Sequence, residues 1–328
     1  MKTQRLRSRI GFFLGVASVL FFVQSGYAQE DVVKFPSRFV NFISFLPPGA
    51  SADLSLRLIT KEAEKFLGQT VVLLNKPGGT HAVGAAAIAS AKPDGYTIGY
   101  TSTTPLVITP FLEKLPYHPL KDFTQIMQYG EVDFGVVVKG DSPFKSFKDL
   151  IEHARQNPKK VVFGTGGATS IGRLTVEQIA KKEGVQFIHI PFKGSPETEA
   201  ALLGGHIFFS ASGFSSAQVE AGQTRLLLLF AEERRVAYPQ IPILKDLGYY
   251  FPSPMFLNVA GPKGLPREIA KKLEDAFTRA MKEPGFIKGM KDIQLPIVYR
   301  NGQQLTEYVA QSYEVFEKLL KELGLAKQ

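Results

Sequence analysis

The sequence predicts an α/β protein of two lobes, in which each lobe is a mostly parallel sheet flanked by helices. Apolar runs of strand length alternate with helical patterns along the chain, and this alternation is typical of parallel sheets covered on both faces. One local pattern, a strand followed by a glycine-containing turn and a helix start with a hydroxyl residue, occurs at Gly49 and again at Gly164. The repetition indicates two similar lobes with a ligand cleft between them.

The first copy of this pattern lies between residues 39 and 68. Phe39 to Leu46 is an apolar run that suits a buried strand, and Pro47-Pro48-Gly49 ends it. Ser51 can cap a helix that carries one apolar face and stops before Gly68. Free N–H groups and the positive end of the helix dipole make such a turn suitable for an anion. An ordinary connection between strand and helix has the same local pattern.

The second copy starts with a strand at 161–163 and runs straight into Gly164-Thr165-Gly166-Gly167-Ala168-Thr169-Ser170. A helix is expected from about Ile171 to Lys182. Gly164-x-Gly166 opens like a dinucleotide fingerprint, but Thr169 stands where its third glycine or alanine belongs. We therefore expect no bound cofactor.

Further elements follow from the same patterns. Strands are expected at 70–74, 96–100, 134–138, 187–191, 207–210, 226–230 and 256–260, and helices at 82–91, 147–155, 197–203, 266–281 and 305–323. We place the crossing between lobes near Asp133 and the return near Pro252. Lobe 1 is then discontinuous, comprising residues 29–133 and 252–328, and lobe 2 comprises residues 134–251.

The amino-terminal segment 1–28 has the three regions of a secretory signal peptide. Four basic residues precede the apolar run Ile10 to Val23, and Gly26 and Ala28 provide small residues for cleavage after Ala28. An uncleaved anchor is the alternative, but spanning a membrane takes roughly 17–25 apolar residues and this run is shorter. We therefore expect export to the periplasm as a mature chain that is not membrane-embedded.

Composition narrows the possible functions. Cysteine is absent, which excludes disulfides, thiolate catalysis and a lipidated cysteine. Removing the signal peptide lowers the formal net charge from +9 to +5, and the remaining basic residues form no stripe interleaved with aromatics. We expect no nucleic-acid partner and a monomer.

Motifs for catalysis or metal binding are also absent. The five histidines show no metal-ligand spacing, and neither a GxSxG elbow nor a phosphate-binding GxxxxGK[ST] loop occurs. We expect no metal site. Asp53, in the first turn of its helix, has two interpretations: a helix-dipole partner that accepts hydrogen bonds from the turn, or a direct ligand contact.

Several short motifs together resemble the substrate-binding proteins of tripartite tricarboxylate transporters, also called Bug receptors. They are PPGxxxD at 47–53, LGQ at 67–69, NKPGG at 75–79, KPDGYT at 92–97, GTGGxxS at 164–170, PFKGS at 191–195 and LLGG at 202–205. Each motif is modest alone, but their order and spacing cover nearly the whole mature chain. The resemblance implies a type II-like periplasmic binding protein that closes on a small carboxylate, held largely by backbone N–H groups of two turns.

Two departures from the family pattern bear on the ligand. Arg173 stands where the family often has histidine. It either pairs with a second ligand carboxylate, or it is an exposed arginine or one paired with Glu177. Phe208 and Ser212 stand where aspartates are common. That loss of acidic groups suits a dianionic ligand or an aromatic acid, and it disfavours an amino acid.

We therefore expect a transport receptor for a small organic di- or monocarboxylate, possibly aromatic, that delivers it to the membrane subunits of a tripartite tricarboxylate-type transporter. A receptor that presents ligand to a sensor kinase and a periplasmic hydrolase remain the alternatives. The predicted ligand-binding residues are Pro48, Gly49, Ala50, Ser51, Asp53, Gly78, Ser102, Thr103, Gly164, Thr165, Gly166, Gly167, Ala168, Thr169, Ser170, Arg173, Phe192, Lys193 and Ser212. No catalytic residue is predicted.

Overall fold

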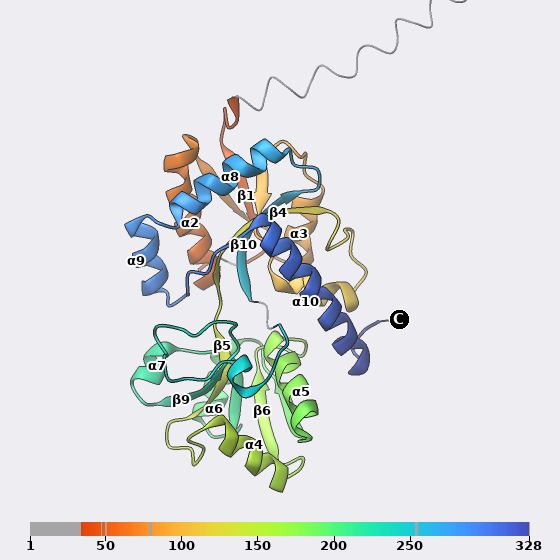
Figure 1. Ribbon diagram of the computed structural model, residues 1–328, viewed down its shortest axis with the longest axis vertical. Helices are drawn as coiled ribbons and strands as arrows, with labels where there is room; N and C mark the ends of the chain where they lie inside the picture. The colour runs from red at the N-terminus through yellow and green to blue at the C-terminus, as the bar shows by residue number, and fades with distance from the viewer. Residues whose placement is uncertain (1–33, 47, 50, 79–80, 253–254, 328) are drawn as a thin grey trace, which may run out of the picture.

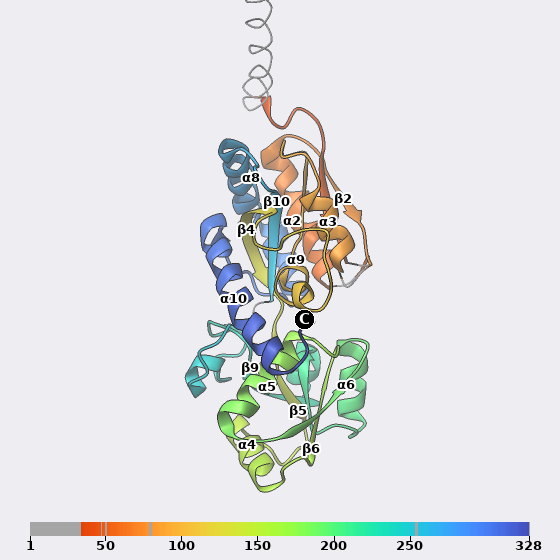
Figure 2. The same ribbon diagram turned by 90° about the vertical axis from the view of Figure 1, so that its right-hand side faces the viewer.

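The computed structural model shows two lobes that meet end to end, each with its own sheet and helices (Figures 1 and 2). It describes residues 34–46, 48–49, 51–78, 81–252 and 255–327. The predicted signal peptide lies outside the described residues. No helix within these ranges is long and apolar enough to cross a membrane.

The first lobe is built on a six-stranded sheet with the order β11-β4-β10-β3-β1-β2. Its strands are β1 (Val40–Ser44), β2 (Val71–Asn75), β3 (Thr97–Gly99), β4 (Phe123–Glu131), β10 (Phe256–Pro262) and β11 (Arg300–Asn301). Its helices are α2 (Ser51–Leu67), α3 (Ala82–Ala89), α8 (Arg267–Ala280), α9 (Pro284–Asp292) and α10 (Gly302–Glu322), with short turns of π-helix at η2 (Thr104–Ile108) and 3-10 helix at η3 (Thr109–Phe111).

The second lobe is built on a five-stranded sheet with the order β7-β6-β8-β5-β9. Its strands are β5 (Phe134–Lys139), β6 (Val161–Thr165), β7 (Phe187–Pro191), β8 (Phe209–Gly213) and β9 (Thr224–Leu229). Its helices are α4 (Phe147–Gln156), α5 (Ile171–Glu183), α6 (Ser195–Leu203) and α7 (Ser216–Glu220), followed by the 3-10 turn η4 (Leu244–Leu247). The chain crosses from β4 to β5 and returns before β10, and Val132 N–H donates to the Met255 carbonyl at 2.9 Å where the two crossings meet.

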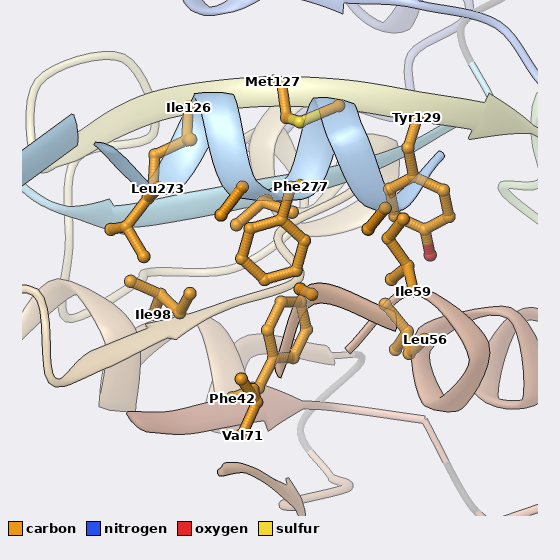
Figure 3. Packing of buried hydrophobic residues seen from close by; sticks show 14 of the residues in the cluster. Phe42, Leu56, Ile59, Val71, Ile98, Ile126, Met127, Tyr129, Leu273 and Phe277 are labelled. Carbon is orange, nitrogen blue, oxygen red and sulfur yellow. The ribbon is translucent and has the colours of Figure 1, made fainter. Parts of the chain in front are cut away.

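Helix α2 follows its sequence pattern. Leu56, Ile59 and Ala63 recur at helical spacing and are buried against α8, which contributes Leu273 and Phe277 to the same cluster (Figure 3). Gly68 then takes a left-handed φ of 69°, which a side chain rarely adopts, and this ends the helix. The position of α2, and of the turn before it, is thus fixed by the core.

The two-lobed α/β fold is confirmed, but the sheets are mixed, not mostly parallel. In the first sheet, β10 runs antiparallel to β3 and β4, and β11 antiparallel to β4. In the second, β5 runs antiparallel to β8 and β9. The reversals have one cause: β4 and β5 are joined directly across the hinge and β10 returns through it, so the crossing strands run opposite to some of their neighbours.

Candidate functional site

The direction of the strands places the predicted turns of the first lobe at the edge that faces the second lobe. Strands β3 and β4 run the same way, because both are antiparallel to β10, and β1 and β2 are parallel to β3. Strand β4 leads directly into the hinge. The carboxyl ends of β1, β2 and β3 therefore lie at the hinge edge, and with them the turns that begin at Pro48, Lys76 and Ser102.

The same reasoning places the turns of the second lobe. Strand β5 leaves the hinge and runs antiparallel to β8, which is parallel to β6, and β6 is parallel to β7. The carboxyl ends of β6, β7 and β8 thus lie at the edge facing the first lobe. Gly166 to Ser170, Phe192 and Ser212 are at this edge. Phe208, by contrast, precedes β8 at its far end beside His153, so it does not line the cleft as an aromatic wall.

The first turn is held by the carboxylate of Asp53, whose residue is fully buried. Its Oδ2 accepts hydrogen bonds from Gly49 N–H and Arg57 Nε, both at 2.9 Å, and its Oδ1 accepts one from Asn75 Nδ2 at 2.7 Å. Burial by itself raises the pKa of Asp53, but the three hydrogen-bond donors together lower it by more. The pKa of Asp53 therefore lies below its ordinary value. The carboxylate is fully engaged within its own lobe, which favours the structural interpretation over direct ligand contact. Ala50 lies outside the described residues.

The second turn is held from two sides. Thr165 Oγ1 donates to the Gly167 carbonyl at 2.8 Å and lies 2.7 Å from His189 Nε2. Arg173 Nη1 donates to the Ala168 carbonyl at 2.6 Å. These contacts fix the path of the chain between strand β6 and helix α5.

Arg173 is one of the residues whose role the sequence left open. Its Nε lies 3.6 Å from Glu177 Oε1, and its Nη1 bonds the Ala168 carbonyl within its own turn. Ser170 caps α5 by accepting from the Arg173 N–H. The guanidinium is thus engaged in the turn and in the pair with Glu177, which favours a structural role.

The turn also presents unpaired donors. The N–H groups of Ala168 and Thr169 donate no hydrogen bond to any residue that the structure describes. Gly167 has a φ of 155°, which an L-residue rarely adopts. Two successive free N–H groups at the start of a helix carry partial positive charge and can donate to an oxyanion.

The predicted walls are polar and largely uncharged. Ser102 is buried with a left-handed φ of 42°, and its N–H donates to Asn258 Oδ1 at 3.2 Å. Ser212 Oγ lies 2.8 Å from Ser195 Oγ, where either hydroxyl can donate. Gly78 follows β2 at the same edge, with a φ of 124°. Lys193 is exposed, and its N–H donates to Glu197.

Packing joins the two turns into one region. Phe45, just before the first turn, stacks on Tyr100 with ring centroids 4.7 Å apart, and Tyr100 precedes Ser102 by two residues. Turn η2 follows Thr103, and its buried residues share an interlobe cluster with Ile171, which follows Ser170. The start of α5 therefore lies beside the segment that follows Thr103, where the two lobes meet.

Sequence reasoning missed three residues of this region. Asn258 accepts from the N–H groups of Thr101 and Ser102 across more than 150 positions of sequence, so no local pattern marks it. His189 contacts Thr165 from the neighbouring strand. His81 has a left-handed φ of 75° and stacks on Phe45 at 4.4 Å, and burial lowers its pKa.

The other side of the hinge carries ion pairs between the lobes. Arg235 of the second lobe pairs with Glu131 and, at 2.8 Å, with Asp133, and Arg300 of the first lobe pairs with Glu232 at 2.6 Å. A cavity of about 1070 Å³ lies among these residues, and another of about 1430 Å³ lies beside α8. Neither cavity is lined by a predicted site residue. In the part of the chain that the structure describes, no three histidine or acidic side chains are grouped to hold a metal ion.

Comparison with known proteins gives matches over most of the chain. The model of the tripartite tricarboxylate transporter family receptor matches residues 55–325. A UPF0065 protein from the gbd 5' region of Cupriavidus necator is 34% identical over 328 residues, covering 100% of this chain and 99% of the relative.

Solved structures show the same fold. The ligand-free crystal structure of a TctC solute binding protein from Polaromonas is 25% identical, with a TM-score of 0.80, covering 88% of this chain and 99% of that one. Rpa4515 of R. palustris, solved with adipate, is 24% identical with a TM-score of 0.73, covering 89% of this chain and 99% of that one.

Proposed function

Because the chain belongs to the tripartite tricarboxylate transporter receptor family, we propose that it is a periplasmic receptor that captures a small organic carboxylate between its lobes. In this proposal the receptor delivers the ligand to the membrane subunits of a tripartite tricarboxylate-type transporter. The signal-peptide pattern of residues 1–28 supports export to the periplasm. We place the lobe boundaries at 133/134 and 251/252, where the chain passes between the two sheets.

One observation carries the proposal: unpaired backbone N–H groups at the hinge-facing edge of the second lobe. Ala168 and Thr169 offer two such donors next to the start of α5, and the start of α2 lies at the facing edge of the first lobe. A helix start carries roughly half a positive charge, so two starts can attract one anion from opposite sides. A ligand that contacts both lobes binds the closed form more tightly than the open form, and it therefore shifts the hinge equilibrium.

The surroundings favour an anion without an ammonium group. Asp53 is the one carboxylate among the predicted site residues, and its oxygens are used by donors of its own lobe. Ser212 contributes a hydroxyl and no charge. A zwitterionic amino acid would find no free carboxylate partner among these residues, so we propose a mono- or dicarboxylate. Adipate, bound by a protein of the same fold, is a suitable first probe.

A thermal-shift screen of the purified protein against mono-, di- and tricarboxylates, aromatic acids and amino acids tests the proposal. Ligand at a hundredfold excess over Kd adds about 2.7 kcal/mol, which raises Tm by about 5 °C. We expect a carboxylate to give this shift and the matching diamine or amino acid to give none. Stabilisation by amino acids alone would contradict the proposed ligand class. Uptake of the hit by cells carrying the membrane subunits, lost on deletion of the receptor, tests delivery.

A further inference from the structure

The glycine-rich turn exposes the N–H groups of Ala168 and Thr169 because the carbonyl groups of the same two peptide units are held by hydrogen bonds on the opposite side. The Gly167 carbonyl accepts from Thr165 Oγ1 at 2.8 Å, and the Ala168 carbonyl accepts from Arg173 Nη1 at 2.6 Å. In a planar trans peptide the N–H points away from the C=O of the same unit. Fixing these carbonyls therefore turns the N–H groups of Ala168 and Thr169 to the opposite side, where they stay unpaired.

The hydroxyl of Thr165 has a single proton, so it can donate to one of its two partners and must accept from the other. A carbonyl oxygen is solely an acceptor, so the 2.8 Å contact to Gly167 uses that proton. The 2.7 Å contact between Thr165 Oγ1 and His189 Nε2 is then a hydrogen bond only if Nε2 carries a proton and donates it. The geometry thus selects the Nε2–H tautomer of His189.

The surroundings of the histidine are consistent with that tautomer. Thr165 is fully buried, and the His189 ring packs 4.9 Å from the ring of Phe163. Burial, and then the charge of Arg173, lower the pKa of His189 to about 4, so the ring is neutral at neutral pH. A neutral imidazole has one N–H, and the contact with Thr165 fixes which nitrogen carries it.

We infer that His189 is a positioning residue of the carboxylate site: its Nε2–H orients the Thr165 hydroxyl, which holds the Gly167 carbonyl and so presents the N–H groups of Ala168 and Thr169. His189 lies on β7 and acts through Thr165. The affinity consequence rests on the proposed function, whereas the tautomer and the state of the two N–H groups do not.

The affinity test compares variants that remove or keep the donor at the Nε2 position. His189→Leu removes it, and His189→Gln places an amide N–H near the same point. Measured by calorimetry with adipate, or with the tightest carboxylate of the thermal screen, we expect His189→Leu and Thr165→Val to weaken binding about tenfold. We expect His189→Gln to stay within about threefold of wild type. His206→Leu, at an exposed histidine, is the matched control and keeps full affinity.

A general loss of packing is separated from positioning by Thr60→Val. Thr60 is also buried, and its hydroxyl donates to the Leu56 carbonyl within α2, away from the turn. We expect this variant to lose stability and keep ligand affinity. If Thr165→Val fails to fold, two single variants take its place. We then expect His189→Leu to weaken binding and Thr165→Ser, which keeps the hydroxyl, to retain it.

Nitrogen-15 NMR of the unliganded protein gives the independent readout. We expect His189 to show a protonated Nε2 and an unprotonated Nδ1 at neutral pH. We also expect His189→Leu, unlike His206→Leu, to shift the amide resonances of Ala168 and Thr169. A proton on Nδ1 alone, or unchanged turn amides and full affinity in a folded His189→Leu, would overturn the inference. If wild type binds no carboxylate, the proposed function fails and these resonances still decide the positioning role.

Discussion

Replacement of Asp53 by asparagine separates the two roles open to this residue. The carboxylate accepts from Gly49, Arg57 and Asn75 at 2.7–2.9 Å and is fully buried. Asparagine keeps the shape but exchanges one acceptor for a donor. Whichever way the amide is turned, its NH₂ group faces at least one donor, so a buried hydrogen bond is lost.

The size of the effect follows from these contacts. A hydrogen bond to a charged group contributes about 1.5–3 kcal/mol. The side chain of Arg57 is 46% exposed, so solvent screens its pairing with Asp53 and that part contributes little. We therefore expect Asp53→Asn to lower the free energy of unfolding by about 2–3 kcal/mol. Because the turn is then held less firmly, affinity should fall by a similar factor for all carboxylates that bind.

Urea unfolding followed by circular dichroism measures the stability, and calorimetry measures the affinity. Asp141→Asn is the matched control, because Asp141 is 72% exposed in its pair with Lys139, and we expect a change within about 0.5 kcal/mol. An unchanged unfolding midpoint in Asp53→Asn combined with abolished binding would refute the structural role and show that this carboxylate contacts the ligand.

Three further predictions follow from single contacts. The pKa of His189 is lowered to about 4 in the folded protein, so as pH drops from about 6.5 to 4 this histidine is protonated in the unfolded chain before it is protonated in the folded one. The free energy of unfolding should therefore fall over this range. His189→Gln should remove this part of the acid-induced loss, as measured by urea unfolding at a series of pH values. Gly172→Ala would place a Cβ 1.7 Å from the Ala211 carbonyl oxygen, so a loss of about 3 kcal/mol or more is expected in urea unfolding, and an unchanged midpoint would show that α5 does not pack this closely on β8. Arg300→Ala removes one of two guanidinium partners of the buried Glu131 and should cost about 2 kcal/mol at pH 7. Arg235 and Arg300 hold the pKa of Glu131 below its ordinary value of 4.5 despite burial, so this cost should shrink as pH falls below 4.5; a cost of the same size at pH 7 and well below pH 4.5 would contradict the role of this pair.

The parts of the fold that follow local patterns could be predicted from sequence. Helix α8 was expected at 266–281 and spans Arg267–Ala280, because Ile269, Leu273 and Phe277 recur at helical spacing. Strand β7 was expected at 187–191 and spans those residues. The apolar residues of each element recur at the spacing of its own secondary structure, so periodicity is enough to locate them.

Strand β4 was not predicted, and its partners explain why. Its sequence FTQIMQYGE mixes apolar residues with Gln128 and Glu131, which are buried. Arg300 donates a hydrogen bond to Gln128 Oε1 at 2.7 Å and one to Glu131 Oε1 at 3.0 Å, from 169 or more positions away. No local sequence pattern marks such a strand. The direction of β10 is set by the hinge crossing, so it could not be predicted from local sequence either.

In the candidate site, too, the residues that are consecutive in sequence could be predicted, and those contributed by distant strands could not. The glycine-rich turns could be predicted because a strand, a turn and a helix start are consecutive in sequence. His189 and Asn258 were missed because each meets the site from a different strand. Arg173 was found by its departure from the family pattern, and its pairing with Glu177 was one of the alternatives; its hydrogen bond to the Ala168 carbonyl became visible only in the structure.

Mapping amide shifts on adding carboxylate shows which parts of the two lobes contact the ligand. In a ¹H–¹⁵N spectrum titrated with adipate, or with the tightest ligand of the thermal screen, we expect the largest shifts at Gly49 to Asp53 in one lobe and at Gly166 to Ser170 in the other. Shifts confined to one lobe, or centred on the cavity around Arg235 and Arg300 on the other side of the hinge, would contradict a carboxylate held between the two turns.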